Sequence, residues 1–501
     1  MKRLCVSLAA LVASSAAFAA DLPTKKAPVV PEKPNCFASL YSYFDSTPAD
    51  CPLSYWGLTF YATIDIGGGY ETHGTPFNNK YPTGVEELVS KNSNRGQWLL
   101  TPNGISQSQV GVKAKEPIGM GWSLVGEVAT GFDPYSLRLA NGPGALVDNN
   151  FNTIANQNSN GDSSRAGQWY NSVGYAGISN DVFGTLTAGR QNSLFLEGVN
   201  AYDPMGGSYA FSPIGYSGRT AGTSDTEDAR INTSVKYAIK YNQFRASGIM
   251  QFGGYSYGNS SNGEWQVGVG GDFDLGGGKL SLDGIYSHVK DQVNLASYGG
   301  VVPLGVPSNA LKATINNAQG VMLLAKYKWN QWTVFGGWER YHLTNPSDSF
   351  PTVGTATVFN SIGNYPVVAS GINPVAYSGA TKPLDFDILW TGVKYAINDR
   401  IDITGAYYLY YQHDFNNPAV VTAATCAPNA APAAAGYSPQ GTAKASCAGW
   451  MNAFSAMIDY RPLKRVDLYA GFMYSRVAGG LATGYLYNSN FDPTVGVRVR
   501  F

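Results

Sequence analysis

The sequence is poor in charge, because Asp, Glu, Lys and Arg make up only 14% of its 501 residues. Soluble domains typically contain about 25% of these residues, so the composition disfavours an ordinary soluble globular protein. The 34 basic and 34 acidic residues cancel, and loss of Lys2 and Arg3 with an N-terminal leader leaves a net charge of −2. A chain without excess positive charge gives no reason to expect a nucleic-acid partner.

Long hydrophobic runs are also missing, except at the N-terminus. Residues 1–19 have the form of a signal peptide, with the basic Met1–Arg3, an apolar stretch and the cleavage motif Ala17–Ala19. That stretch is too short to cross about 30 Å of hydrocarbon, and no run of about 18 apolar residues follows it. The sequence therefore excludes a helical membrane protein and predicts export of a mature chain that begins at Ala20.

Cysteine is scarce, and the five cysteines become four when Cys5 leaves with the signal peptide. The others form two local pairs, Cys36 with Cys51 and Cys426 with Cys447. Even, closely spaced cysteines in an oxidising compartment predict two disulfide bonds. No histidine lies within ligand spacing of either pair, so we expect no zinc site there.

Aromatic residues and glycine are abundant, with 33 tyrosines and 59 glycines. Together with the low charge, they are typical of a twisted sheet with aromatic residues at membrane interfaces. A large secreted β-sandwich would share this composition, so the alternation of side chains has to decide between the two.

The C-terminal segment 493–501 alternates without error between apolar and polar residues. Val495, Val497 and Phe501 share one face with Val499, whereas Arg498 and Arg500 lie on the other. A period of two predicts a β-strand, and two arginines opposite the valines indicate a wet inner face. The chain ends on this strand with an aromatic residue, which suggests the closing strand of an outer-membrane β-barrel.

Residues 58–501 repeat one pattern of strand, short turn, strand and long polar loop, and we predict an all-β, transmembrane antiparallel barrel of sixteen strands. An even number lets the first and last strands pair, so that the barrel closes without free edges. Short turns at the periplasmic end and long extracellular loops are typical of outer-membrane barrels. The predicted strands are 58–70, 105–115, 122–131, 168–178, 184–190, 230–240, 243–253, 264–274, 279–288, 320–329, 332–342, 385–396, 401–412, 449–460, 466–476 and 491–501.

Two of these strands, 320–329 and 385–396, carry apolar residues on both faces. Packing at a subunit interface and packing against a loop folded into the barrel both explain this pattern. Ahead of the barrel, residues 20–57 form a predicted periplasmic segment. It has a Pro- and Lys-rich leader at 20–34 and a small region closed by the Cys36–Cys51 disulfide.

The chain resembles general diffusion porins of alphaproteobacterial outer membranes. The similar pieces are Gly184–Gln191 before a long third loop, the repeated Val-Lys-Tyr-Ala at 235–238 and 393–396, and the terminal Phe501. The Cys36–Cys51 segment before the first strand is also similar to that group, and together these pieces cover most of the mature chain. The resemblance implies a sixteen-stranded and usually trimeric barrel, with a third loop that folds inward and narrows the pore.

The third loop corresponds to 192–226, which is too long for a barrel turn. It lacks a clean Pro-Glu-Phe-Gly-type acidic core, and its nearest equivalents are Glu197 and Asp203. We expect these carboxylates to form the constriction, facing a basic wall that includes Lys113 and Arg498.

Other charged residues are placed inside the barrel by strand parity, because a charge on the lipid face costs about 2–4 kcal/mol at the midplane. Opposite charges across a narrowed pore would create a transverse field that favours polar solutes, and pairing between neighbouring strands is the structural alternative for each. The predicted lumen charges are Asp65, Glu71, Glu127, Lys115, Arg245, Asp402, Asp467 and Arg500.

Catalysis is not expected, because the four histidines do not converge. His73 is predicted to face the lumen, and His288, His342 and His413 to face lipid or headgroups. The aspartate pairs 272/274 and 385/387 are interpreted as solvated strand ends in preference to calcium sites. No metal or other cofactor is predicted.

The sequence predicts an outer-membrane porin, a passive water-filled channel for small hydrophilic solutes and ions. A closed barrel acting in adhesion or surface recognition is the alternative. The expected partners are outer-membrane lipid and lipopolysaccharide, the barrel-assembly machinery that recognises Phe501, and two further copies of the chain, the last on the resemblance alone.

Overall fold

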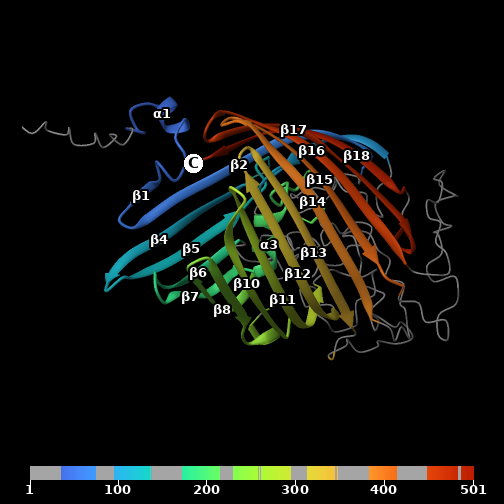
Figure 1. Ribbon diagram of the computed structural model, residues 1–501, viewed down its shortest axis with the longest axis horizontal. Helices are drawn as coiled ribbons and strands as arrows, with labels where there is room; N and C mark the ends of the chain where they lie inside the picture. The colour runs from blue at the N-terminus through green and yellow to red at the C-terminus, as the bar shows by residue number, and fades with distance from the viewer. Residues whose placement is uncertain are drawn as a thin grey trace, which may run out of the picture.

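The protein folds as one closed antiparallel β-barrel with a small N-terminal cap at one end (Figure 1). The predicted signal peptide, most long loops, Cys426 and Cys447 lie outside the described residues, so the signal peptide and the second disulfide stay predictions. The computed structural model describes residues 35–74, 95–135, 137, 172–214, 230–257, 259, 261–294, 313–344, 347, 383–414, 448–482 and 487–501.

The barrel has sixteen strand positions, as predicted. β3 (Arg95–Pro102) and β4 (Gln109–Gly119) share the second position, because both pair with β2 (Leu58–Gly74), one after the other along its length. β1 (Leu53–Tyr55) only extends the edge of β2. The other strands are β5 (Trp122–Gly131), β6 (Val173–Asn180), β7 (Gly184–Asn192), β8 (Arg230–Tyr241), β9 (Phe244–Gln251), β10 (Gly263–Leu275), β11 (Gly278–Asn294), β12 (Ala313–Trp329), β13 (Trp332–Thr344), β14 (Leu384–Asn398), β15 (Ile401–Gln412), β16 (Gly449–Leu463), β17 (Val466–Gly479) and β18 (Ser489–Arg500).

The barrel closes where β18 pairs with β2, in a register that sets Arg498 opposite Asp65. Along β18 the outward residues include Phe491 and Val495, both more than a third exposed, whereas the inward Thr494 is buried. This alternation confirms the one predicted for the C-terminal strand. It places apolar side chains on the outer wall and polar side chains in the lumen.

Seven tight turns lie at the end of the barrel that also carries the cap and the C-terminus, and we call it the turn end; the opposite end is the loop end. Positive φ angles at Asn242 and Asn330 and at Gly276 and Gly277 let the chain reverse within two residues. One predicted turn is displaced: β16 continues through Pro462 to Leu463, and the reversal occurs at 464–465.

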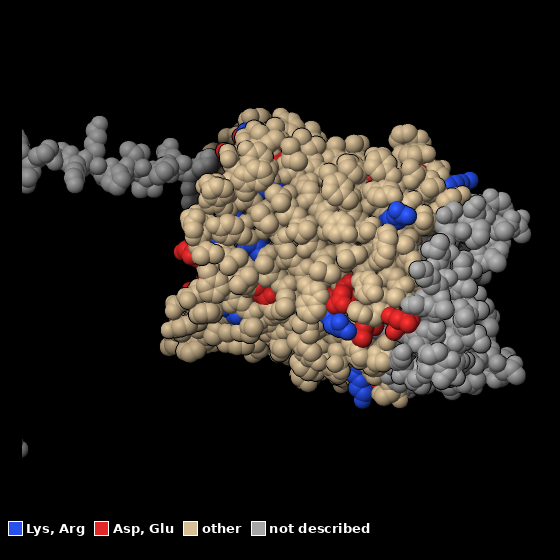
Figure 2. Space-filling model, turned by 45° about the vertical axis from the view of Figure 1, so that its right-hand side comes forward, with Lys and Arg blue, Asp and Glu red and all other residues tan. Residues whose placement is uncertain are grey.

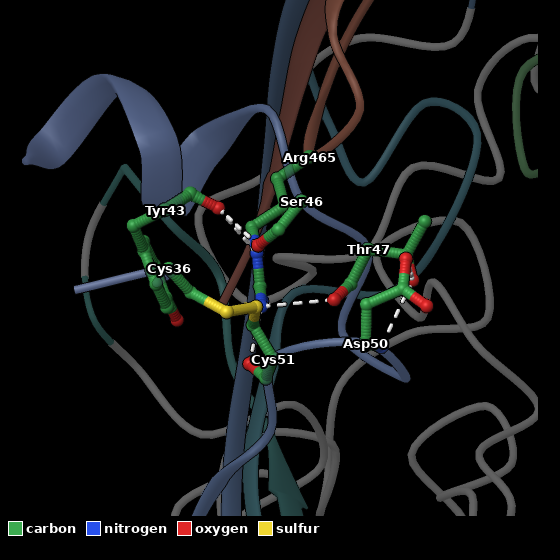
Figure 3. Close-up of a disulfide and its surroundings, with 7 residues drawn as sticks. All are labelled: Cys36, Tyr43, Ser46, Thr47, Asp50, Cys51 and Arg465. Atoms are coloured by element: carbon green, nitrogen blue, oxygen red, sulfur yellow. Dashed lines mark hydrogen bonds between the residues drawn. A yellow bond between two sulfur atoms is a disulfide. The ribbon is translucent and has the colours of Figure 1, made fainter. Parts of the chain in front are cut away.

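The N-terminal cap contains α1 (Leu40–Phe44), which begins at the N-cap residue Ser39, and the predicted disulfide between Cys36 and Cys51. Figure 3 shows the side chain of Arg465, from the turn between β16 and β17, entering the loop that this disulfide closes. Its guanidinium donates to the carbonyl oxygens of Tyr43, Thr47 and Cys51. This buried side chain therefore helps to fasten the cap to the barrel.

Phe501 lies between the cap and the first barrel strand. Its ring packs edge to face against Phe44 with centroids 5.8 Å apart, and its N–H donates to the carbonyl of Ala62. Asp45 of the cap also pairs with Arg400 in the turn between β14 and β15. The cap thus contacts both ends of the barrel chain and one further turn.

Candidate functional site

A short helix, α3 (Leu194–Tyr202), follows β7 and lies inside the barrel (Figure 1). Ser193 caps its N-terminus, accepting a hydrogen bond from the N–H of Leu196. The inward side chain of Gln266 on β10 accepts hydrogen bonds from the N–H groups of Leu194 and Phe195. These polar contacts satisfy N–H groups that the first helical turn leaves without intrahelical partners.

The apolar side of α3 packs on the inner wall of the barrel. Phe195 and Val199 are fully buried, in one cluster with Met322 and Leu324 of β12 and Trp390 of β14. Strands 320–329 and 385–396 are apolar on both faces because this loop covers their inner face. Of the two explanations open at the sequence level, packing against an in-folded loop accounts for the inner residues.

The end of α3 is held against the wall by Asp203. Its carboxylate accepts a hydrogen bond from the hydroxyl of Tyr408, with an O–O distance of 2.6 Å, and another from the N–H of Gly207 at 2.7 Å. Burial raises the pKa of this carboxyl, and these hydrogen bonds oppose the rise. Asp203 is only 2% exposed, so the expectation that it faces the open pore is wrong; it fixes the loop.

A second group of contacts holds the last turn of α3. The hydroxyl of Tyr202 donates to Asp283 on β11, and Arg245 on β9 bridges Tyr202, Asp283 and Asp272. The ammonium of Lys326 donates to the carbonyl of Ala201 at the C-terminal end of the helix, where a cation is favourable. Arg245 faces the lumen as predicted, but it is committed to this network.

Glu197 is the acidic residue that α3 presents to open space. Its side chain is 47% exposed and forms an ion pair with Lys236 on β8. Both residues line a cavity of about 530 Å³ between α3 and the wall, together with Lys240, Arg245 and Asp283. Lys236 was not singled out from the sequence, although the alternation of Val235, Lys236 and Tyr237 would have placed it inside.

Lys113 and Glu127 lie opposite each other on β4 and β5 and face the lumen. Glu127 accepts hydrogen bonds from the hydroxyls of Tyr61 and Tyr175, and Lys113 lies 3.8 Å from Glu127 and over the Tyr61 ring. The Lys113 side chain is still 58% exposed. Lys115 lies two residues further on the same face and is also exposed.

Arg498 and Arg500 face inward, and both donate to the carboxylate of Asp467 on β17. Their charges are thereby balanced in part. Asp65 lies opposite Arg498 in the barrel seam and is fully buried, accepting hydrogen bonds from Tyr469 and from the N–H of Ile105. These residues form the wall of the barrel at the seam, and the structure does not bring Arg498 into an ion pair with Glu197.

A second inward segment, 103–108, was not predicted and interrupts the second strand position between β3 and β4. Asn103 adopts a left-handed backbone conformation (φ 65°), in which the chain leaves the wall. The carbonyl of Gly104 accepts from the N–H of Ala210, and Gln107 accepts from the hydroxyl of Tyr209. The third loop therefore extends across the lumen from α3 to this segment. The Asn103-Gly104 pair was the turn signal in the sequence.

The described part of the chain contains neither a cluster of metal-ligating side chains nor a membrane-spanning helix. No group of three or more His, Cys, Asp or Glu residues is placed to hold a metal ion there. None of the helices described is long and apolar enough to cross a membrane.

The family model described as Gram-negative porin matches residues 7–480. The chain belongs to the Gram-negative porin family. A search of curated protein sequences gives no match. As a member of this family with a closed barrel, the porin is an integral protein of the outer membrane.

Among solved structures, the porin is similar to the anion-selective porin from Comamonas acidovorans, at 13% identity and a TM-score of 0.51, over 89% of this chain and 99% of that one. It is equally similar to a loop-deletion mutant of OmpT, an outer membrane protein of Vibrio cholerae, at 12% identity, a TM-score of 0.51 and the same coverage of both chains. At these identities the likeness concerns the fold.

The outer wall of the porin has one feature that sequence reasoning missed. Charged atoms are sparse on the face in Figure 2 and gather in a patch beside the loop end. Arg340 on β13 lies 3.4 Å from both Asp385 and Asp387 on β14, which also pair with His342 and His413. Strand parity directs all five outward, away from the lumen. We call them the outer charge cluster; the two aspartates are ion-paired and are not simply solvated strand ends.

Proposed function

We propose that this porin is a passive, water-filled channel for small hydrophilic solutes and ions. The observation that carries the proposal is the cavity of about 530 Å³ that α3 leaves beside the wall, lined by the ionisable side chains of Glu197, Lys236 and Lys240. A loop that narrows a barrel and leaves a charged passage supports diffusion of polar solutes and opposes that of apolar ones. Glu197 and Lys236 are the proposed constriction pair, with Lys113 on the wall.

The same proposal includes a homotrimer surrounded by outer-membrane lipid and lipopolysaccharide. It also includes delivery by the barrel-assembly machinery through recognition of Phe501, and removal of residues 1–19 before assembly. Membership of the porin family supports these parts.

Purified protein added to a planar lipid bilayer is expected to produce stepwise, ohmic current increases. Heat-denatured protein serves as the control, and folded protein is identified by its altered electrophoretic mobility before heating. Folded barrel that inserts into the bilayer without conducting would contradict the channel and favour a closed barrel with a surface-recognition role.

Glu197→Gln is expected to shift the permeability ratio of chloride to potassium toward chloride by about twofold at 0.1 M salt. The substitution removes a half-exposed negative charge from the cavity and releases Lys236 from its ion pair. Reversal potentials under a salt gradient measure the ratio, and the shift should shrink at 1 M, where the Debye length is about 3 Å. Glu116→Gln is the matched control, because Glu116 lies opposite Leu124 on the outward face.

A further inference from the structure

Five lysines face the lumen at the turn end, and we call them the lysine ring: Lys113 and Lys115 on β4, Lys240 on β8, Lys279 on β11 and Lys328 on β12. The register supports their inward direction, because Lys279 lies opposite Asp274 on one side and opposite Lys328 on the other, all on the inner face. All five are exposed. They therefore present their charge to water in the lumen.

The carboxylates nearest to the lysine ring are already engaged. Asp272 lies 3.8 Å from Lys240 but also accepts from Ser281 and lies 3.0 Å from Arg245. Glu127, 3.8 Å from Lys113, accepts from two tyrosine hydroxyls. Each of these two carboxylates offsets the charge of the lysine beside it, so the uncompensated positive charge lies on the other three lysines.

Three members of the ring, Lys115, Lys279 and Lys328, form no ion pair within the part of the chain that the structure describes. Lys279 and Lys328 are directly opposite each other, an arrangement of like charges that destabilises a sheet. Asp274, across from Lys279, is the facing carboxylate on this part of the wall. The arrangement leaves positive charge in excess here.

The remaining acidic residues of the turn-end wall are balanced by arginine. Arg461 donates to both Asp402 and Asp459, and Lys394 lies 3.9 Å from Asp402. Asp467 accepts from both Arg498 and Arg500. Asp274 and the turn residues Asp181 and Asp399 form no ion pair among the described residues, so these three carboxylates offset only part of the charge of the five lysines.

We propose that the lysine ring makes the channel anion-preferring, with small carboxylates and phosphates as its preferred class of solutes. Positive charge around a narrow, low-dielectric passage raises the local concentration of anions and lowers that of cations. At 0.1 M salt the Debye length of about 10 Å is comparable to the distance from the wall to the middle of a pore, so the charges act on ions in transit. This inference rests on the proposed function, because it requires an open channel.

The test uses full-length protein in planar bilayers under a gradient of potassium chloride near 0.1 M. The wild type is expected to pass chloride in preference to potassium. The triple substitution Lys240→Gln, Lys279→Gln and Lys328→Gln should lower the permeability ratio of chloride to potassium by about threefold, since each exposed charge contributes a small, screened interaction. With phosphate in place of chloride, the permeability ratio of phosphate to potassium should likewise be lower in the triple variant than in the wild type.

Two controls separate charge from damage to the barrel. The charge-conserving variant with arginine at the same three positions should keep the wild-type ratio. Lys290→Gln, at an exposed outward position of β11, should also leave it unchanged. Electrophoretic mobility before and after heating verifies that each variant is folded.

The outcomes distinguish this inference from the channel proposal. Absence of conductance from folded protein contradicts the channel itself. A conducting wild type that prefers potassium, or a glutamine variant with the wild-type ratio, overturns the lysine-ring inference and leaves the channel standing.

Discussion

Asp203→Ala is expected to raise the mean single-channel conductance by about twofold and to increase the current noise. The carboxylate of Asp203 links Tyr408 of β15 to the N–H of Gly207 in the loop, and it is fully enclosed. Hydrogen bonds to a charged group are worth about 1.5–3 kcal/mol each, and their loss leaves buried polar groups without hydrogen-bond partners. The loop end should then detach from the wall for part of the time and widen the passage.

Single-channel recording at one voltage and salt concentration measures both quantities. Tyr408→Phe removes only the contact to β15 and should give an intermediate effect, and Glu116→Gln, on the outward face of β4, should leave conductance unchanged. If Asp203→Ala changed ion selectivity with steady, wild-type conductance, the carboxylate would be acting on ions in the pore and the anchoring role would be wrong.

Arg465→Met is expected to release the N-terminal cap while the barrel remains folded. The guanidinium is fully buried, donates to three carbonyl oxygens of the cap and lies 4.1 Å from the ring centre of Tyr43. Burial lowers its pKa, but arginine stays charged at neutral pH. Methionine fills a similar volume without donors, and the loss should weaken docking of the cap by about 3 kcal/mol.

Hydrogen exchange of the amides in 39–51 reports on this docking, and protection there should fall by about 100-fold, while protection in β17 should persist. Arg465→Lys should behave almost like Arg465→Met, because a single ammonium cannot reach all three carbonyl oxygens as the planar guanidinium does. Unchanged protection in the cap would show that the disulfide and the β1–β2 pairing hold it without Arg465.

Strand positions were predictable because alternation on a half-apolar wall is a strong constraint. The terminal valines and arginines indicated the correct faces, and the segment 401–412 was predicted to the residue. The second position was predicted as the single strand 105–115, which missed β3 and began inside the inward segment 103–108. Its interruption depends on Asp65, Tyr469 and Ala210, partners that are distant in sequence and meet only inside the closed barrel.

The candidate constriction was less predictable than the wall. Glu197 and Asp203 look alike in the sequence, since both are isolated acids in a polar loop. One points to open space and the other into a pocket formed by Tyr408, and only the packing of the loop separates them. The assumption that charges avoid the outer wall failed at Arg340 and Asp387, because strand ends lie outside the costly midplane.

The outer charge cluster limits how much of this sector can sit in hydrocarbon. On β14 the outward residues from Leu389 to Ile397 are apolar or aromatic except for Thr391, and this stretch begins two residues after Asp387. A strand that rises about 3.4 Å per residue and tilts about 40° covers about 20 Å of thickness over that stretch. Typical outer-membrane barrels present an apolar belt of about 25 Å. Lipid beside β13–β15 must therefore thin by a few Å or give way to protein, so this sector sets a local hydrophobic mismatch in the membrane around it.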